Sequence, residues 1–158
     1  MTPDLSTPEA RLAFVSPIAA KYGLDPLIVC AVCEQESSWN QNAVRFEPGF
    51  LALYVKPKNP AAPTTLEILK ACSFGLMQVM GEVAIELGWQ GHFLTELCDP
   101  ATGVDFGCRK LQRCFSVHGD AETSLLAYNG GGNALYPEQV LARVEHYKNP
   151  PPTFACDQ

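Results

Sequence analysis

The chain has 158 residues, 47% of them hydrophobic and 18% charged, and its formal net charge is −6. This length and hydrophobic content supply one folded core, which excludes a disordered protein. The largest basic cluster is the pair Arg109-Lys110, so the positive patch of a nucleic-acid-binding protein is missing.

The amino-terminal residues 1–6 include neither a basic segment nor an apolar one. No uninterrupted apolar stretch approaches the roughly 18 residues that a membrane span needs. We therefore expect a protein that is synthesised in the cytoplasm without a signal peptide and does not insert into a membrane.

Proline and glycine divide the chain into short predicted helices. We expect the first helix to open at Ser16-Pro17 and to close at Gly23. Asp25-Pro26 predicts the start of the second, since aspartate supplies an N-cap and proline fits the first helical position. Further helices are predicted at 80–87, from 99–100 onward, at 123–128 and at 137–147. In the helix after residue 100, apolar residues at helical spacing predict a core face: Val104, Cys108, Leu111 and Phe115.

Strand patterns are nearly absent, and only residues 50–55 have a composition that can pair briefly. The segment 45–65 is rich in proline and lacks a helical period, so we predict a long loop or extended lobe there, a kind of segment that is commonly functional. The expected fold is mainly α. We predict one globular domain over residues 1–158, with a catalytic core at about 15–148 and an inserted loop or small extra lobe at about 45–72.

The seven cysteines are an odd number, and no export signal precedes them, so we interpret most as buried small hydrophobic residues. Cys30 and Cys33 have the C-x-x-C spacing of a zinc or redox site, which stays an alternative hypothesis. A four-ligand zinc site needs a second close pair, and Cys108 and Cys114 are too far apart in sequence. The histidines are scattered and expected at the surface or at helix caps: His92, His118 and His146. We expect neither a metal nor another cofactor.

Glu36 lies near the end of the second predicted helix. Residues three, four and seven positions before it share its helix face, and these are Cys33, Val32 and Val29. Apolar surroundings and the negative end of the helix dipole both raise the pKa of a carboxyl group. A glutamate with a pKa nearer neutrality can donate a proton, although Glu34 and Glu36 are equally consistent with solvated residues at a helix end.

Three further strings combine groups that suit sugar binding. Residues 73–78 read Ser-Phe-Gly-Leu-Met-Gln, which joins a tight glycine to an amide, and residues 127–131 read Ala-Tyr-Asn-Gly-Gly. Tyr147 ends the last predicted helix. Taken singly, residues 75–77 are more typical of a packed helix start, and residues 130–132 of an ordinary connection.

Together with the residues 35–40, Gln-Glu-Ser-Ser-Trp-Asn, these strings resemble in their order the soluble type of lytic transglycosylase. That family has a lysozyme-like fold and shares a glycosidase family with goose-type lysozymes. The resemblance covers about residues 15–148, and residues 21–26 also look like the family's approach to its catalytic helix. It implies a lysozyme-like domain of short helices.

The resemblance also implies a reaction. Glycoside cleavage ordinarily uses two carboxylates, but the family implies that one glutamate acts twice on peptidoglycan, with help from the acetamido group of the sugar. Glu36 would protonate the oxygen that links N-acetylmuramic acid (MurNAc) to N-acetylglucosamine (GlcNAc). As a carboxylate it would then take the proton of the MurNAc C6 hydroxyl, whose attack gives a 1,6-anhydro product.

The roles that the resemblance assigns to other residues are expectations of the same kind. Ser37 and Gln78 would bind the reacting sugar or orient Glu36, and Tyr147 would lie close enough to fix the Glu36 carboxylate. The remaining residues would contact substrate: Met77 packed on a sugar ring, Tyr128 and Asn129 as a floor beside the acid, and Ser73 and Gly75 in the intervening string.

The interval between Glu36 and Gly75 is longer than the family pattern, and the excess falls within 45–65. Glu47 in this insertion is a second carboxylate that either lines the cleft or forms an exposed pair with Arg45. The aromatic residues of the insertion offer a stacking surface for glycan: Phe46, Phe50 and Tyr54.

Two other functions remain open on the sequence alone. A lysozyme-type muramidase would hydrolyse the same bond, and a non-catalytic module would bind peptidoglycan or build a virion or secretion assembly. The expected partner is the peptidoglycan glycan strand, with no nucleic acid. Since the cell wall lies outside the cytoplasm, delivery by a phage particle, by lysis or by a secretion machine is expected.

Overall fold

The structure is a computed structural model that describes residues 3–56 and 61–149. Its helices are α1 (Pro8–Ala20), α2 (Pro26–Ser37), α3 (Pro48–Phe50), the π-helical η1 (Leu51–Val55), α4 (Thr65–Lys70), α5 (Gly81–Glu86), the 3-10 helix η2 (Leu94–Cys98), α6 (Pro100–His118), α7 (Ala121–Tyr128) and α8 (Tyr136–Lys148). Its strands are β1 (Val44–Phe46), β2 (Cys72–Phe74) and β3 (Val79–Met80). The fold is mainly α, as predicted.

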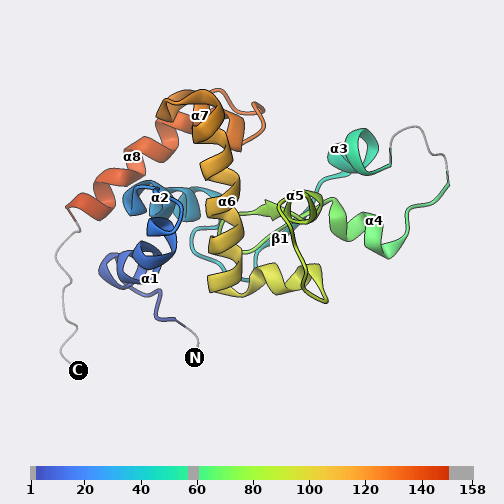
Figure 1. Cartoon of the computed structure of the whole chain (residues 1–158), viewed down its shortest axis with the longest axis horizontal. Coiled ribbons are helices and arrows are strands. Elements are labelled where there is room, and N and C mark those ends of the chain that lie inside the picture. Colours follow the sequence, from blue (N-terminus) through green and yellow to red (C-terminus); the bar gives the residue numbers. More distant parts are fainter. Residues whose placement is uncertain (1–2, 57–60, 150–158) are drawn as a thin grey trace.

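Helix α6 runs through the middle of the molecule. Helices α1, α2, α7 and α8 lie on one side of it, whereas the strands, α5 and the segment with α3 and α4 extend to the other side (Figure 1). The predicted core face of α6 is confirmed, because Val104, Cys108 and Leu111 are buried and Phe115 packs against the core. This helix therefore joins the two halves between which a cleft can form.

Side-chain caps fix the helix starts that the sequence predicts. The Asp25 carboxylate accepts a hydrogen bond from the Leu27 amide at 2.8 Å, and the Asp99 carboxylate accepts one from the Thr102 amide at 2.9 Å. These bonds satisfy amide groups that a helix start leaves without partners. The predicted starts of α2 and α6 are confirmed.

The predicted start of α1 at Ser16-Pro17 is wrong. The helix begins at Pro8, with the Thr7 hydroxyl as its cap, and Pro17 lies inside it. Proline removes one amide donor from a helix interior. The neighbouring Ser16 hydroxyl donates to the Leu12 carbonyl at 2.6 Å. The earlier pair Thr7-Pro8 supplies the same start signal nine residues sooner, and α1 is therefore longer than predicted.

The prediction of a strand at 50–55 is also wrong. Residues 48–55 are helical, and the strands form one antiparallel sheet in the order β1-β2-β3. Val44 pairs with Phe74, and Ser73 pairs with Met80. Strands of two or three residues are too short to show an alternating pattern, so the sequence does not reveal them.

The predicted loop or lobe after Arg45 contains regular structure. It includes β1, α3 and η1, and it is followed by α4, where Thr64 and Glu67 form a capping box. Lys56 pairs with Glu67 at 3.4 Å and ties η1 to α4. The segment extends away from the helical body (Figure 1), and it exposes Leu53 and Tyr54.

The cysteines in the described residues are free thiols, and most are buried: Cys30, Cys33, Cys72, Cys98, Cys108 and Cys114. This confirms the interpretation as small hydrophobic residues, while Cys156 lies outside the described residues. Within 3–56 and 61–149, no group of three or more His, Cys, Asp or Glu side chains is placed to hold a metal. None of the helices described has the length and apolar composition that crossing a membrane requires.

Candidate active site

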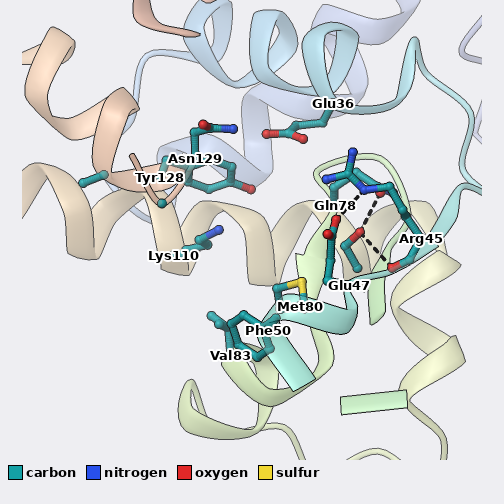
Figure 2. Close-up of a pocket in the computed structure, with 13 residues that line it drawn as sticks. Glu36, Arg45, Glu47, Phe50, Gln78, Met80, Val83, Lys110, Tyr128 and Asn129 are labelled. Carbon is teal, nitrogen blue, oxygen red and sulfur yellow. Dashed lines mark hydrogen bonds and ion pairs between the residues drawn. The ribbon is translucent and has the colours of Figure 1, made fainter. Parts of the chain in front are cut away.

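A pocket of about 350 Å³ lies where α2, β1, β2 and α3 meet α6 and α7. The structure brings six of the ten predicted site residues into its lining: Glu36, Glu47, Ser73, Gln78, Tyr128 and Asn129. Figure 2 shows Glu36 entering from α2 on one wall, with Tyr128 and Lys110 across the opening and Glu47 with Arg45 to the side. The remaining predicted residues, Ser37, Gly75, Met77 and Tyr147, are not part of the lining.

Glu36 is the penultimate residue of α2 and is half-buried. The side chains behind it on the helix, Val29, Val32 and Cys33, are fully buried. Burial raises the pKa of Glu36, as the sequence predicts. Three groups act in the opposite direction and lower that pKa: the Tyr136 hydroxyl, the Lys110 ammonium and the Arg45 guanidinium.

The tyrosine that contacts the Glu36 carboxylate is Tyr136 and not Tyr147. The Tyr136 hydroxyl donates a hydrogen bond to Glu36 at 2.6 Å. The Tyr147 hydroxyl donates to Glu34 at 2.6 Å and accepts from the Trp39 indole at 2.7 Å. Glu34 also contacts His146 at 3.0 Å, so this second glutamate belongs to a network between α2 and α8 outside the pocket.

Hydrogen bonds of the Gln78 side chain stabilise the turn between β2 and β3. The Gln78 amide nitrogen donates to the carbonyls of Ala43 and Gly75 at 3.0 and 2.9 Å, and its oxygen accepts from the Ser73 hydroxyl at 2.8 Å. Gly75 has a φ of +68°, and a Cβ atom there would lie 2.3 Å from the Leu97 carbonyl oxygen. The Gln78 amide therefore fixes the turn, and none of its hydrogen bonds reaches Glu36.

The predicted substrate contact of Met77 is wrong because its side chain faces the protein, whereas the role of Ser37 stays a prediction. Met77 is fully buried and packs against Gly107 of α6, so it cannot cover a sugar ring. The Ser37 hydroxyl lies 2.8 Å from the Leu76 carbonyl and 3.0 Å from the Cys33 carbonyl. These residues join α2 and α6 to the turn at 75–78 and so position the wall of the pocket.

Tyr128 and Asn129 lie at the end of α7 in the same pocket as Glu36. The Tyr128 hydroxyl donates to the Met77 carbonyl at 2.7 Å. The side chain forms part of the pocket wall, but it is only 1% exposed. The Asn129 side-chain oxygen accepts from the Asn133 amide at 3.0 Å. Their predicted role as a floor beside the acid stays a prediction, and the arrangement is compatible with it.

The inserted segment contributes Glu47 and Phe50 to the pocket. Glu47 forms an ion pair with Arg45, so the two interpretations of this residue, in the cleft and paired with arginine, both hold. The Phe50 and Tyr54 rings lie 4.8 Å apart, and Tyr54 is 67% exposed. Glu47, the other pocket carboxylate, is thus neutralised by a neighbour, whereas Glu36 is not directly paired with a cation.

The family model named Transglycosylase SLT domain matches residues 15–147. The chain belongs to this family. A relative called transglycosylase, from Enterobacteria phage PRD1, is 31% identical over 134 residues, which are 80% of this chain and 40% of that protein. The chain therefore spans about two fifths of the length of this curated relative.

Solved structures show the same fold as this SLT domain. An inactive glutamate-to-glutamine mutant of the lytic transglycosylase Slt from Pseudomonas aeruginosa matches 91% of this chain and 25% of its own chain, with a TM-score of 0.61 and 18% identity. A complex of the 70-kDa soluble lytic transglycosylase with bulgecin A matches 89% of this chain and 20% of its own, with a TM-score of 0.50 and 20% identity.

The sequence argument missed two groups that act on Glu36, Tyr136 and Lys110. Lys110 follows Phe106 and Gly107 by four and three positions, and both are buried. Side chains at those offsets share a helix face, so a lysine directed toward the core was readable from the sequence. Tyr136 carries no comparable signal, because it begins a helix next to a proline.

Proposed function

We propose that this SLT domain is a lytic transglycosylase that cleaves the MurNAc-β-1,4-GlcNAc bond of peptidoglycan and forms 1,6-anhydroMurNAc. The observation that carries the proposal is the environment of the Glu36 carboxyl group. Burial raises the pKa of this glutamate, a tyrosine hydroxyl orients it, and it faces a pocket within a fold of the matching family. A general acid works best when its pKa lies near the working pH.

In the first step, protonated Glu36 gives its proton to the glycosidic oxygen as the bond from MurNAc C1 to that oxygen breaks. GlcNAc leaves with a free C4 hydroxyl, and the acetamido oxygen of MurNAc closes on C1. Glu36 becomes a carboxylate in this step. The Tyr136 hydroxyl, 2.6 Å away, then donates a stronger hydrogen bond, because its acceptor is now charged.

In the second step, the Glu36 carboxylate removes the proton of the C6 hydroxyl of MurNAc. The freed oxygen attacks C1 and displaces the acetamido oxygen, which closes the 1,6-anhydro ring and returns Glu36 to its protonated form. No water is consumed. The same glutamate thus serves as acid and then as base, a scheme that fits a pocket whose other carboxylate, Glu47, is bound to Arg45.

The substrate would lie against the remaining pocket residues. We propose that Tyr128 and Asn129 contact the sugar beside Glu36, and that Ser73, Gln78 and Glu47 line the adjoining part of the cleft. We further propose a catalytic core of about residues 15–148, with the inserted segment at 45–72 extending the glycan-binding surface through Phe50.

Delivery to the cell wall is a separate proposal. The curated relative from Enterobacteria phage PRD1 carries the name transglycosylase. We propose that the protein reaches peptidoglycan as part of a phage particle or after lysis, with a secretion machine as the alternative route.

The test is mass spectrometry of fragments released from purified peptidoglycan by the wild-type protein and by Glu36→Gln. We expect anhydromuropeptides from the wild type and at least a hundredfold less product from Glu36→Gln, because the amide keeps the shape but cannot transfer a proton. Glu47→Gln is the matched control: because it leaves the acid Glu36 in place, it should still release anhydromuropeptides, even if the altered cleft changes KM.

Other products would change the assignment. Reducing muropeptides would make the protein a lysozyme-type muramidase. Binding of peptidoglycan without any release would make it a non-catalytic module. Activity that survives in Glu36→Gln but disappears in Glu47→Gln would move the acid to Glu47.

A further inference from the structure

Lys110 is unusual among the cations of this protein. In residues 3–56 and 61–149, every other lysine and arginine pairs with a carboxylate, except Arg11, which donates to the Leu5 carbonyl. Lys110 has neither an ion pair nor a hydrogen bond within the described chain. Its ammonium lies 4.1 Å from the centre of the Tyr128 ring.

Burial of the Lys110 ammonium also costs folding free energy. The residue is half-buried on α6, and burial lowers the pKa of its ammonium. A cation removed from water without a hydrogen-bond partner destabilises the folded state, so packing alone does not account for it. The ring of Tyr128 offsets part of this cost through a cation–π contact.

The surroundings of Lys110 show where its hydrogen bonds can go. Figure 2 shows the side chain rising from α6 beneath Tyr128 toward the pocket, across from Glu36. The titratable groups that act on the ammonium are Glu36 from α2 and Arg113 and Cys114 from α6 itself. An ammonium has three donors, and the open side of this one is the pocket that would hold the glycan.

We propose that Lys110 is a specificity-determining residue that binds a carboxylate of the substrate strand, an inference that rests on the proposed function. Peptidoglycan supplies carboxylates in two places. A MurNAc without a stem peptide carries a free lactyl carboxylate, and an intact stem peptide carries its own carboxylates. In a protein with a net charge of −6, such a contact gives an anionic polymer a point of attraction inside the cleft.

The experiment compares two matched substrates. Peptide-free glycan strands carry lactyl carboxylates, and the same strands treated to convert these groups to methylamides are neutral. We expect the wild-type protein to have a KM about tenfold lower for the charged strands, the size of one charge-assisted hydrogen bond. Lys110→Met should abolish this preference, so that its KM values for the charged and neutral strands become equal when both are measured at the same pH, and Lys110→Arg should restore the preference.

A control variant distinguishes the loss of a contact at Lys110 from the general effect of removing one positive charge. Lys148→Met removes the same charge from an exposed pair on α8, outside the pocket, and should keep the wild-type preference. A second substrate pair, strands with intact stem peptides and the same strands with amidated peptides, identifies the source of the carboxylate. If the wild-type protein prefers the charged member only in this second pair, the contact of Lys110 is with a carboxylate of the stem peptide.

Several outcomes would overturn the inference. Equal KM values of the wild-type protein for the charged and neutral members of both pairs would exclude the contact without any variant. A Lys110→Met protein that keeps the preference, and only shifts the pH profile on every substrate, would show that Lys110 acts through Glu36. Absence of both binding and cleavage by the wild type would reject the proposed function as well, whereas equal cleavage of all strands would reject the Lys110 contact alone.

Discussion

At the scale of single residues, the sequence identified Glu36 but not its partner. Tyr136 and Tyr147 are 11 positions apart, which is close to three helical turns, so both lie on nearly the same face of α8. Only the register of α8 against α2 decides which tyrosine meets which glutamate. That register is set by tertiary packing. In the structure, Tyr136 donates a hydrogen bond to Glu36, and Tyr147 donates one to Glu34.

Tyr136→Phe should move the pH dependence of cleavage. The hydroxyl lowers the pKa of Glu36 by stabilising its carboxylate, so its removal raises that pKa. Because the first step needs protonated Glu36, the alkaline limb of the kcat/KM profile should shift to higher pH by about one unit, the size of one hydrogen bond. The measurement is product release between pH 4 and pH 9.

Tyr147→Phe is the matched control for this experiment. It also removes one hydroxyl from α8, but the hydroxyl contacts Glu34 and Trp39. Its profile should coincide with that of the wild type. If Tyr147→Phe shifts the alkaline limb and Tyr136→Phe does not, the assignment of the orienting tyrosine is reversed.

At the scale of elements, the sequence succeeded where local chemistry decides the structure. Asp25 and Asp99 cap α2 and α6 as predicted. The short strands and the buried position of Met77 were missed, because they depend on contacts with segments distant in sequence. The turn at 75–78 is such a case, since it contacts Ala43, the residue before β1, and Gly107 of α6.

Gly107→Ala tests how α6 positions this turn. A Cβ atom at residue 107 would lie 2.6 Å from Met77 Cβ and 2.2 Å from its sulfur, so the turn must shift. We expect a loss of about 1–3 kcal/mol in the free energy of unfolding, typical of overpacking, and a lower kcat. Thermal unfolding and product release provide the two readouts.

Gly132→Ala is the control for the glycine substitution. The nearest atom to a Cβ there is the Asn129 side-chain oxygen at 4.0 Å, and no positive φ is needed. Its stability should stay within about 0.5 kcal/mol of the wild type. An equal loss of stability in both variants would contradict the role of close packing at Gly107.

At the scale of the whole molecule, the mainly α fold was predictable because proline, glycine and capping residues mark most helix ends. The pocket was predictable only in part. Its residues come from α2, the inserted segment, the sheet, α6 and α7, and the sequence motifs name members of most of these elements without giving their distances. Lys110 was not predicted, since its proposed role depends on the absence of a polar partner among residues 3–56 and 61–149.

Ionisation of the buried Glu36 should lower the Tm of the wild-type protein. The folded protein raises the pKa of Glu36, so ionisation of this group favours unfolding once the pH exceeds the unfolded value of about 4.3. Glu36→Gln removes this penalty. At pH 7.5 its Tm should exceed that of the wild type by about 2–4 °C, the effect of 1 kcal/mol in a domain of this size.

The pH dependence of this gain is its decisive feature. Near pH 4 the carboxyl is mostly protonated in the unfolded state, and the raised pKa keeps it more so in the folded state. The two proteins should therefore differ in Tm much less at pH 4 than at pH 7.5. Calorimetry at both pH values makes the comparison. A gain that is equal at pH 4 and pH 7.5 would attribute the effect to packing of the amide rather than to the charge.

Two consecutive carbonyls of the turn at 75–78 accept hydrogen bonds from opposite walls of the pocket. Ser37, next to Glu36, binds the Leu76 carbonyl, and Tyr128 binds the Met77 carbonyl. The C-terminal ends of α2 and α7 are therefore both hydrogen-bonded to the same turn, at two neighbouring residues. Folding has already met the entropic cost of aligning them, so the acid and the facing tyrosine are preorganised before a glycan strand arrives.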